Sequence, residues 1–151
     1  MTAKDLSNRD YRALARFRYA LRSFEAFSAQ AASQAGLSPS QHQLLLAIRG
    51  FDDPPPSISD MAERLQIKVH STTELVARAE AKGLVERSTD PSDGRRVVLA
   101  LTTRGEDLLA ELSLVHKDEL RRFRTEMNNV LSELDHKASS SSPESRLSGN
   151  K

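Results

Sequence analysis

Apolar residues recur at three- and four-residue steps near the start of the chain, which is the spacing of one helical face. The positions on this face are Leu14, Phe17, Leu21, Phe24 and Ala31. Gly36 follows them, and glycine often ends a helix. The pattern predicts a long helix from about Asp10 to Ala35.

A second helix is predicted from Ser40 to Arg49, with Ser38 as its cap and Pro39 in its first turn. Its inward side chains are Leu44, Leu45 and Ile48. The Pro-rich stretch from Asp52 to Pro56 that follows is expected to be a loop.

Two short helices joined by a tight turn come next, which is the arrangement of a helix-turn-helix. We expect Ser59 to cap the first helix and residues 66–68 to form the turn. The second helix runs from about Val69 to Lys82 and ends at Gly83. The expected inward positions are Met61, Ala62 and Leu65 on the first helix, and Thr72, Leu75, Val76 and Ala79 on the second.

A hairpin is predicted after this pair of helices. Asp93-Gly94 is a strong turn signal between two segments, Leu84 to Glu86 and Val97 to Leu101, that can pair as strands. Arg95 and Arg96 then lie at or just past the hairpin tip. A hairpin that follows a helix-turn-helix is a wing.

A last helix is predicted from about Thr102 to Leu134. We expect it to break or bend between Phe123 and Asn129, where two asparagines lower the helix propensity. The Ser-rich tail that follows, residues 136–151, is expected to be disordered.

The two terminal helices carry apolar stripes too long for the small central part to cover, and such stripes need a partner. Packing against the same helices of a second chain gives a two-fold homodimer. A helical hairpin within one chain is the alternative. The expected fold is mainly α with a small β-wing. Residues 1–36 and 102–135 are the dimerisation helices, 37–101 the winged helix-turn-helix domain and 136–151 the tail.

Composition narrows the classes of function. The chain has 151 residues and no cysteine, which excludes disulfides, thiolate metal sites and cysteine redox chemistry. It shows no apolar run of membrane-spanning length and no secretory signal, so we expect a cytoplasmic protein without membrane contact. The net charge is only +1. Because residues 57–104 hold eight basic and seven acidic side chains, any nucleic-acid contact must come from local patches.

Motifs that carry catalysis are missing from the sequence. The four histidines show no metal-ligand spacing. The chain has no phosphate loop, dinucleotide fingerprint or nucleophile elbow. We therefore expect no enzyme, no metal and no cofactor.

The second helix of the predicted helix-turn-helix has a polar outer face. Small hydroxyls and the N–H groups at a helix start can bind phosphates or base edges in a major groove. Glu74 opposes phosphate attraction, although it can accept a hydrogen bond from cytosine N4. An ordinary solvated helix face is the other interpretation. The outer residues are His70, Ser71, Thr73, Glu74, Ala77 and Arg78, with Lys68 just before them.

The stretch "LVERSTDPSDGRRVVLALTTRGEDLL" resembles the wing signature of the MarR family of transcription regulators. That signature has Asp-x-Arg, then Leu-Thr, then Gly, and its positions here are Asp93, Arg95, Leu101, Thr102 and Gly105. Upstream, "ISDMAERLQIKVHSTTELVARAEAKGLVER" looks like the helix-turn-helix of the family. The resemblance covers about residues 37–120.

The resemblance implies a homodimer that binds a pseudo-palindromic site in double-stranded DNA, and a repressor that a small-molecule effector releases. Each second helix would enter a major groove and each wing a minor groove. On this mapping Arg95 is the wing-tip arginine and Asp93 holds it in position, while Arg96 serves a phosphate or folds back on an acid. The expected DNA contacts are Lys68, His70, Ser71, Thr73, Arg78, Arg95 and Arg96.

Members of the family often hold a ligand between the dimer helices and the winged domain, and aromatic acids and phenols are frequent effectors. The residues expected to line such a pocket are Phe17, Phe24, His42, Leu45 and His116. Each of them can also be an ordinary core residue. Without cysteine, the chain cannot be one of the thiol-based sensors of the family.

The near-neutral central segment and Glu74 favour a second hypothesis. A winged helix can serve as a protein-interaction or dimerisation module without sequence-specific DNA binding. DNA binding through phosphates must weaken steeply with salt, so a salt titration separates the two hypotheses.

Overall fold

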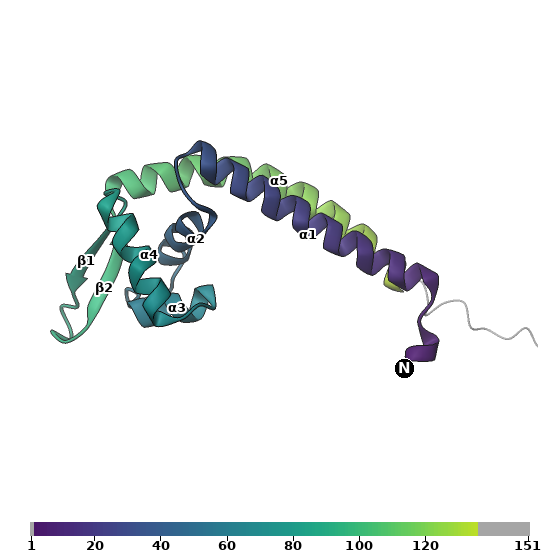
Figure 1. Cartoon of the computed structure of the whole chain (residues 1–151), viewed down its shortest axis with the longest axis horizontal. Coiled ribbons are helices and arrows are strands. Elements are labelled where there is room, and N and C mark those ends of the chain that lie inside the picture. Colours follow the sequence, from purple (N-terminus) through teal and green to yellow (C-terminus); the bar gives the residue numbers. More distant parts are fainter. Residues whose placement is uncertain (1, 136–151) are drawn as a thin grey trace, which may run out of the picture. The chain divides into compact units, whose positions relative to one another are not determined.

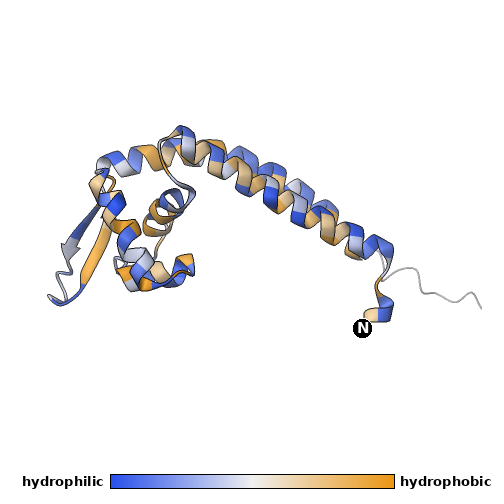
Figure 2. Cartoon of the chain, viewed as in Figure 1, coloured by the Kyte–Doolittle hydropathy of each residue, from blue (hydrophilic) through white to orange (hydrophobic). Residues whose placement is uncertain are grey.

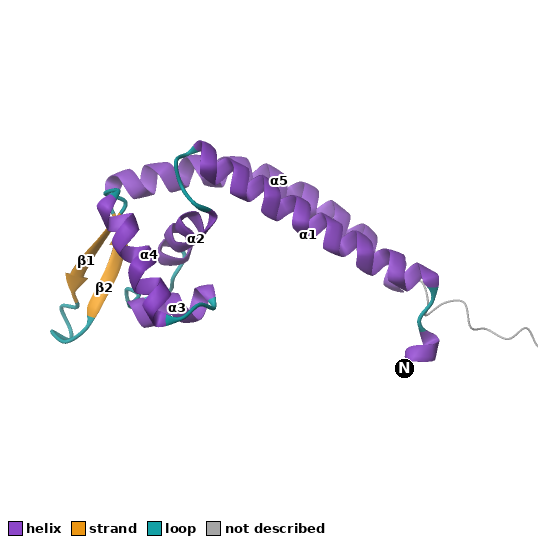
Figure 3. Ribbon diagram, viewed as in Figure 1, coloured by secondary structure: helices purple, strands orange, loops and turns teal. Residues whose placement is uncertain are grey.

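The computed structural model describes residues 2–135, and the Ser-rich tail lies outside them. The elements in chain order are η1 (Ala3–Asp5), α1 (Asn8–Gln34), α2 (Pro39–Arg49), α3 (Ile58–Leu65), α4 (Val69–Ala81), β1 (Val85–Thr89), β2 (Val97–Leu101) and α5 (Thr103–Asp135) (Figures 1 and 3). The fold is mainly α with a small two-stranded wing, which confirms the predicted class. None of these described helices has both the length and the apolar character to cross a membrane.

The chain divides into two compact units, each described by itself. The first holds α1 up to Glu25 and α5 from Glu119 onward, which lie side by side in Figure 1. Arg16 links the two helices, because its guanidinium forms ion pairs with Glu126, at 3.8 Å, and with Glu133. The second unit, Ala26–Asp118, contains α2, α3, α4 and the hairpin.

Local hydrogen bonds set where the short helices begin. Ser38 caps α2 as predicted, and its Oγ accepts the main-chain N–H of Gln41 at 3.1 Å. The cap of α3 is Ser57, so the prediction of Ser59 is wrong. Ser57 Oγ accepts the N–H of Asp60 at 3.2 Å, and Asp60 Oδ2 accepts the N–H of Ser57 at 2.8 Å. This reciprocal capping box forms only from Ser57, since the residue three positions after Ser59 is an alanine.

The inner face of α4 is the one that its periodicity predicts. Thr72, Leu75, Val76 and Ala79 are buried, while the residues between them are exposed. The apolar members of this face join one core with residues from α2, α3, both strands and the start of α5. Figure 2 shows the same alternation of apolar and polar positions along the helices. This core fixes which side of α4 faces outward.

The wing is an antiparallel hairpin that runs in register from Val85↔Leu101 to Thr89↔Val97. Residues 90–96 form its tip. Val98 and Leu99 of β2 are buried, whereas β1 is largely polar, as Figure 2 shows. At the other edge of β2, the N–H of Leu99 donates to the carbonyl oxygen of Pro56 at 2.8 Å. The loop before α3 is thereby joined to the wing.

Helix α5 is continuous from Thr103 to Asp135, so the break expected between Phe123 and Asn129 is wrong. Phe123 packs against Phe24 with ring centroids 5.4 Å apart, and Val130, one residue after the two asparagines, is buried. These apolar contacts offset the weak intrinsic propensity of asparagine, because tertiary packing contributes most of the stability of a helix in a protein.

Candidate nucleic-acid interface

The outward face of α4 gathers the polar residues that were predicted to contact DNA. His70, Ser71, Thr73 and Arg78 are all exposed. His70 Nε2 lies 3.4 Å from Glu74 Oε1, one helical turn further on. Glu74 therefore faces the same way as the predicted contacts and offers an acceptor beside the imidazole.

The start of α4 is open to an incoming anion. Its N-cap residue, Lys68, makes no side-chain hydrogen bond to the first turn. The hydroxyls of Thr72 and Thr73 donate backward to the carbonyl oxygens of Lys68 and Val69, at 2.9 and 3.0 Å. First-turn N–H groups without a cap are free to donate hydrogen bonds to a phosphate oxygen.

Asp93 shapes the tip of the wing through the main chain. Its Oδ1 accepts the backbone N–H of Arg95 at 3.0 Å, and its carbonyl oxygen accepts the N–H of Arg96, also at 3.0 Å. The guanidinium of Arg95 has no hydrogen-bond or ion-pair partner within residues 2–135. Asp93 thus fixes the turn from which Arg95 projects, and it forms no ion pair with the Arg95 side chain.

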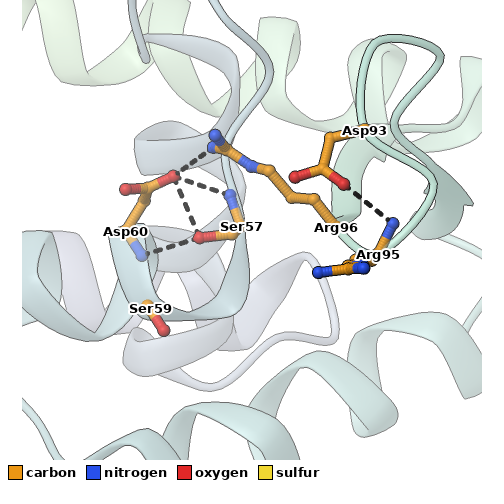
Figure 4. Close-up of a pocket in the computed structure, with 6 residues that line it drawn as sticks. All are labelled: Ser57, Ser59, Asp60, Asp93, Arg95 and Arg96. Atoms are coloured by element: carbon orange, nitrogen blue, oxygen red, sulfur yellow. Dashed lines mark hydrogen bonds and ion pairs between the residues drawn. The ribbon is translucent and has the colours of Figure 1, made fainter.

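Arg96 folds back onto an acid, one of the two roles expected for it. Its Nη2 donates to Asp60 Oδ2 at 2.9 Å and to the carbonyl oxygen of Pro55 at 3.1 Å. Figure 4 shows the Arg96 guanidinium against Asp60 and the Arg95 side chain apart from it. These two arginines and Asp93 line an open hollow together with Asp60 and two serines, Ser57 and Ser59.

Asp60 is the centre of this cluster. Hydrogen bonds and charge hold the pKa of its carboxyl below the ordinary value, chiefly the main-chain N–H of Ser57, then the Ser57 hydroxyl, Arg96 and Arg64. Burial acts in the opposite direction. The sequence signals Asp60 only as half of a capping box with Ser57. Its contact with Arg96, 36 positions away, carries no local signal.

A further arginine of the wing also has a partner. Arg87 Nε of β1 lies 2.5 Å from Glu80 Oε1 near the end of α4. Although Arg87 lies on the first strand of the wing, the ion pair holds its side chain against the helix. Of the three wing arginines Arg87, Arg95 and Arg96, only Arg95 extends from the described chain without a partner.

The residues expected to line a ligand pocket fall into two groups, one in each unit. In the first unit, Phe17 is half-buried and Phe24 packs on Phe123. Phe24 also lines a hollow between α1 and α5, whose other lining residues are Tyr19, Ala20, Ser23, Glu119, Arg122, Phe123 and Glu126.

In the second unit, Leu45 is fully buried in the core, and the rings of His42 and His116 lie 4.7 Å apart. His116 Nε2 is 2.8 Å from Ser28 Oγ, and the edge of the His116 ring meets Phe27. His42 Nδ1 is buried without a hydrogen-bond partner among the described residues. Burial, and secondarily the charge of His116, lower the pKa of His42.

The residues 2–135 hold no group of three or more His, Asp or Glu side chains placed to bind a metal ion. The two most prominent features of the exposed surface are the outer face of α4 and the tip of the wing.

Comparison with known proteins identifies this arrangement. Residues 35–96 match the model of the MarR family. The HTH-type transcriptional regulator SarZ of Staphylococcus saprophyticus is 29% identical over 75 residues, which are 50% of this chain and 51% of SarZ. An uncharacterized HTH-type transcriptional regulator of Bacillus subtilis, YxaD, is 34% identical over 65 residues, 42% of this chain and 46% of that protein. The chain thus spans about half the length of the curated relatives it matches.

Solved structures agree on the fold. An F27L mutant of MepR from S. aureus, bound to an oligodeoxyribonucleotide, matches with a TM-score of 0.63 at 22% identity, over 82% of this chain and 94% of that one. At this level of identity the likeness concerns the fold. Residues 35–96, which hold the helix-turn-helix and most of the wing, thus resemble the MarR family of transcription regulators, and the described chain has the fold of the MepR mutant.

Proposed function

We propose that this protein is a transcription regulator of the MarR type, a homodimer that binds a specific pseudo-palindromic site in double-stranded DNA and represses transcription until a small molecule releases it. One observation carries the proposal. The exposed polar face of α4 and Arg95 of the wing tip, whose side chain has no partner within residues 2–135, belong to one compact unit, supported by one core.

Within this proposal, α4 enters a major groove. His70, Ser71, Thr73 and Arg78 contact base edges and phosphates, and Lys68 with the open start of α4 binds the backbone. Arg95 enters a flanking minor groove, whose negative potential attracts a cation that projects on a narrow loop. The MepR mutant bound to an oligodeoxyribonucleotide supports the use of this fold on DNA.

The terminal helices supply the dimer in the proposal, with residues 1–36 and 102–135 as the dimerisation segments. Large apolar side chains remain exposed in the first unit, among them Leu14 at 47%, Leu120 at 55% and Leu131 at 56%. A second copy of the chain covers them. Two α4 helices in such a dimer read half-sites about one helical turn apart.

Release by an effector follows from the same geometry. A two-fold protein must match the spacing of its two half-sites, so a small change in the separation of the α4 helices abolishes binding. We assign the effector contacts to the residues of the two groups described above, Phe17, Phe24, His42, Leu45 and His116. Aromatic acids and phenols suit these side chains.

The test is a selection of random DNA duplexes on the purified protein at moderate salt. Enrichment of an inverted repeat with half-sites about one turn apart supports the proposal. The affinity for the selected site should fall steeply as salt is raised. A folded protein that enriches no sequence contradicts the proposal and favours the protein-interaction module.

A further inference from the structure

One carboxylate oxygen connects the wing to the helix-turn-helix. Asp60 Oδ2 accepts the N–H of Ser57 at 2.8 Å, the hydroxyl of Ser57 at 3.0 Å and Nη2 of Arg96 at 2.9 Å. The first two bonds cap α3, and the third comes from the hairpin (Figure 4). The start of α3 and the wing therefore share an acceptor.

Two hydrogen bonds hold the Arg96 side chain against Asp60 and Pro55. Its exposed fraction is 33%, and its Nε is buried without a hydrogen-bond partner among residues 2–135. A buried donor without a partner costs free energy. That cost arises only in the folded-back position, and there the two bonds of Nη2, to Asp60 and to Pro55, offset it.

The wing needs such a link, since a two-stranded hairpin alone is marginally stable in water. The bonds within residues 90–96 fix the shape of the tip and leave its direction relative to α3 open. Direction comes from contacts outside the hairpin. On the α3 side these are the bond from Leu99 to Pro56 and the two bonds of Arg96.

We propose that Arg96 is a positioning residue, which braces the wing against α3 through Asp60 and Pro55. Of the two adjacent arginines, only Arg95 is then presented to DNA. This inference rests on the proposed function. It assigns the two adjacent arginines different roles. Arg95 contacts the minor groove, and Arg96 acts through Arg95.

A double-mutant cycle on the selected duplex separates a brace from a second DNA contact. We expect Arg95→Ala and Arg96→Ala each to weaken binding on the order of tenfold. The double variant should bind no worse than Arg95→Ala, because misdirecting the wing costs nothing once Arg95 is absent. If the two arginines were independent DNA contacts, the loss of affinity in the double variant would instead be the product of the two single losses. Hydroxyl-radical footprints of Arg96→Ala should lose protection in the outer minor groove and keep it where α4 binds.

For Asp60→Ala, the brace and simple electrostatics predict opposite changes in DNA affinity. Removing an acid near DNA should strengthen binding by simple electrostatics, whereas a brace predicts that Asp60→Ala weakens it as Arg96→Ala does. Asp60→Ala also loses the cap of α3, so Ser57→Ala serves as the matched control. It weakens that cap and leaves the Arg96–Asp60 pair in place. We expect Ser57→Ala to bind within about twofold of the unaltered protein.

The outcomes are distinct. Failure of the unaltered protein to select any DNA overturns the proposed function and this inference together. Selective binding with multiplied losses in the cycle, or stronger binding by Asp60→Ala, overturns the inference alone. A loss by Ser57→Ala equal to that of Asp60→Ala also overturns it, since the cap would then explain the effect. Faster amide exchange at Leu99 in Arg96→Ala supports it without DNA.

Discussion

Gly105 lies directly against the main chain of Leu84. A Cβ atom at Gly105 would be 2.2 Å from the carbonyl oxygen of Leu84, far inside contact distance. Thr102 secures the same junction, because its N–H donates to that carbonyl at 3.1 Å and its Oγ1 donates to the carbonyl of Gly83 at 2.6 Å. Thr102 Oγ1 also accepts the N–H of Gly105 at 3.0 Å. The Leu-Thr and Gly of the wing signature thus attach the start of α5 to the segment between α4 and β1.

We expect Gly105→Ala to destabilise the protein by about 1–3 kcal/mol, since backbone must move to admit the methyl group. This figure is net of the gain of about 1 kcal/mol in helix propensity that alanine brings. Denaturant unfolding at fixed protein concentration measures the change. Gly94→Ala is the control, because a Cβ at Gly94 meets no atom of the described residues within 4 Å. Equal stability of the two variants would contradict the packing argument.

Sequence predicts best what is decided by neighbouring residues. Ser38 and Gly83 mark helix ends through local bonds and backbone freedom, and the wing signature locates the hairpin. The error at Ser59 arises because two serines compete, and only Ser57 has an acid three positions later. The error in α5 arises because Phe123 packs on Phe24, about a hundred residues away in sequence, and this contact stabilises the helix.

Candidate functional residues follow the same rule. The outward face of α4 is set by periodicity, so its exposed residues were predicted one by one. The environment of Arg96 depends on Asp60, which lies on another element 36 positions away. The hydrophobic and polar pattern around Asp60 therefore does not predict this contact. Adjacent arginines look equivalent in sequence, and only the folded chain distinguishes them.

Removing the wing-tip cation should weaken DNA binding. We expect Arg95→Ala to cost about 1–3 kcal/mol of binding free energy on the selected duplex if its side chain reads the groove. Fluorescence anisotropy with labelled duplex gives the affinity. Unchanged affinity would remove the wing from the mechanism.

Glu74 should influence which base is preferred. A carboxylate in a major groove accepts from cytosine N4 and repels phosphates. We expect Glu74→Ala to bind random DNA more tightly and to lose preference at one position of each half-site. Repeating the duplex selection with this variant measures both effects. An unchanged selected sequence would show that Glu74 does not read a base.

The burial of His42 should make stability depend on pH. Because its pKa in the folded chain is below the ordinary value of 6.5, the unfolded chain takes up a proton that the folded chain resists. Its contribution is complete above about pH 6.5 and is lost as the pH falls toward the folded pKa. Urea unfolding between pH 8 and pH 5 should show this decline, and His42→Asn should reduce it. The same decline in both proteins would exclude His42 as its source.

The exposed apolar face of the first unit should hold the dimer together. We expect Leu14→Glu to raise the dimer dissociation constant on the order of a hundredfold, since two buried leucines are lost per dimer. Sedimentation velocity over a range of concentrations measures it. Ala15→Glu adds the same charge about 100° further around the helix and should remain dimeric. If both variants remained dimeric, the interface would lie elsewhere.

The bond from Leu99 to Pro56 has a consequence for how this molecule avoids unwanted association. An exposed edge strand is a template on which another chain can add a strand. At the outer edge of β2 the N–H of Leu99 is already taken by a proline carbonyl. Pro54, Pro55 and Pro56 have no N–H to offer in return, so this segment occupies the edge and cannot extend the ladder. On this edge of β2 the prolines disfavour the addition of a further strand, and they leave the tip of the wing exposed.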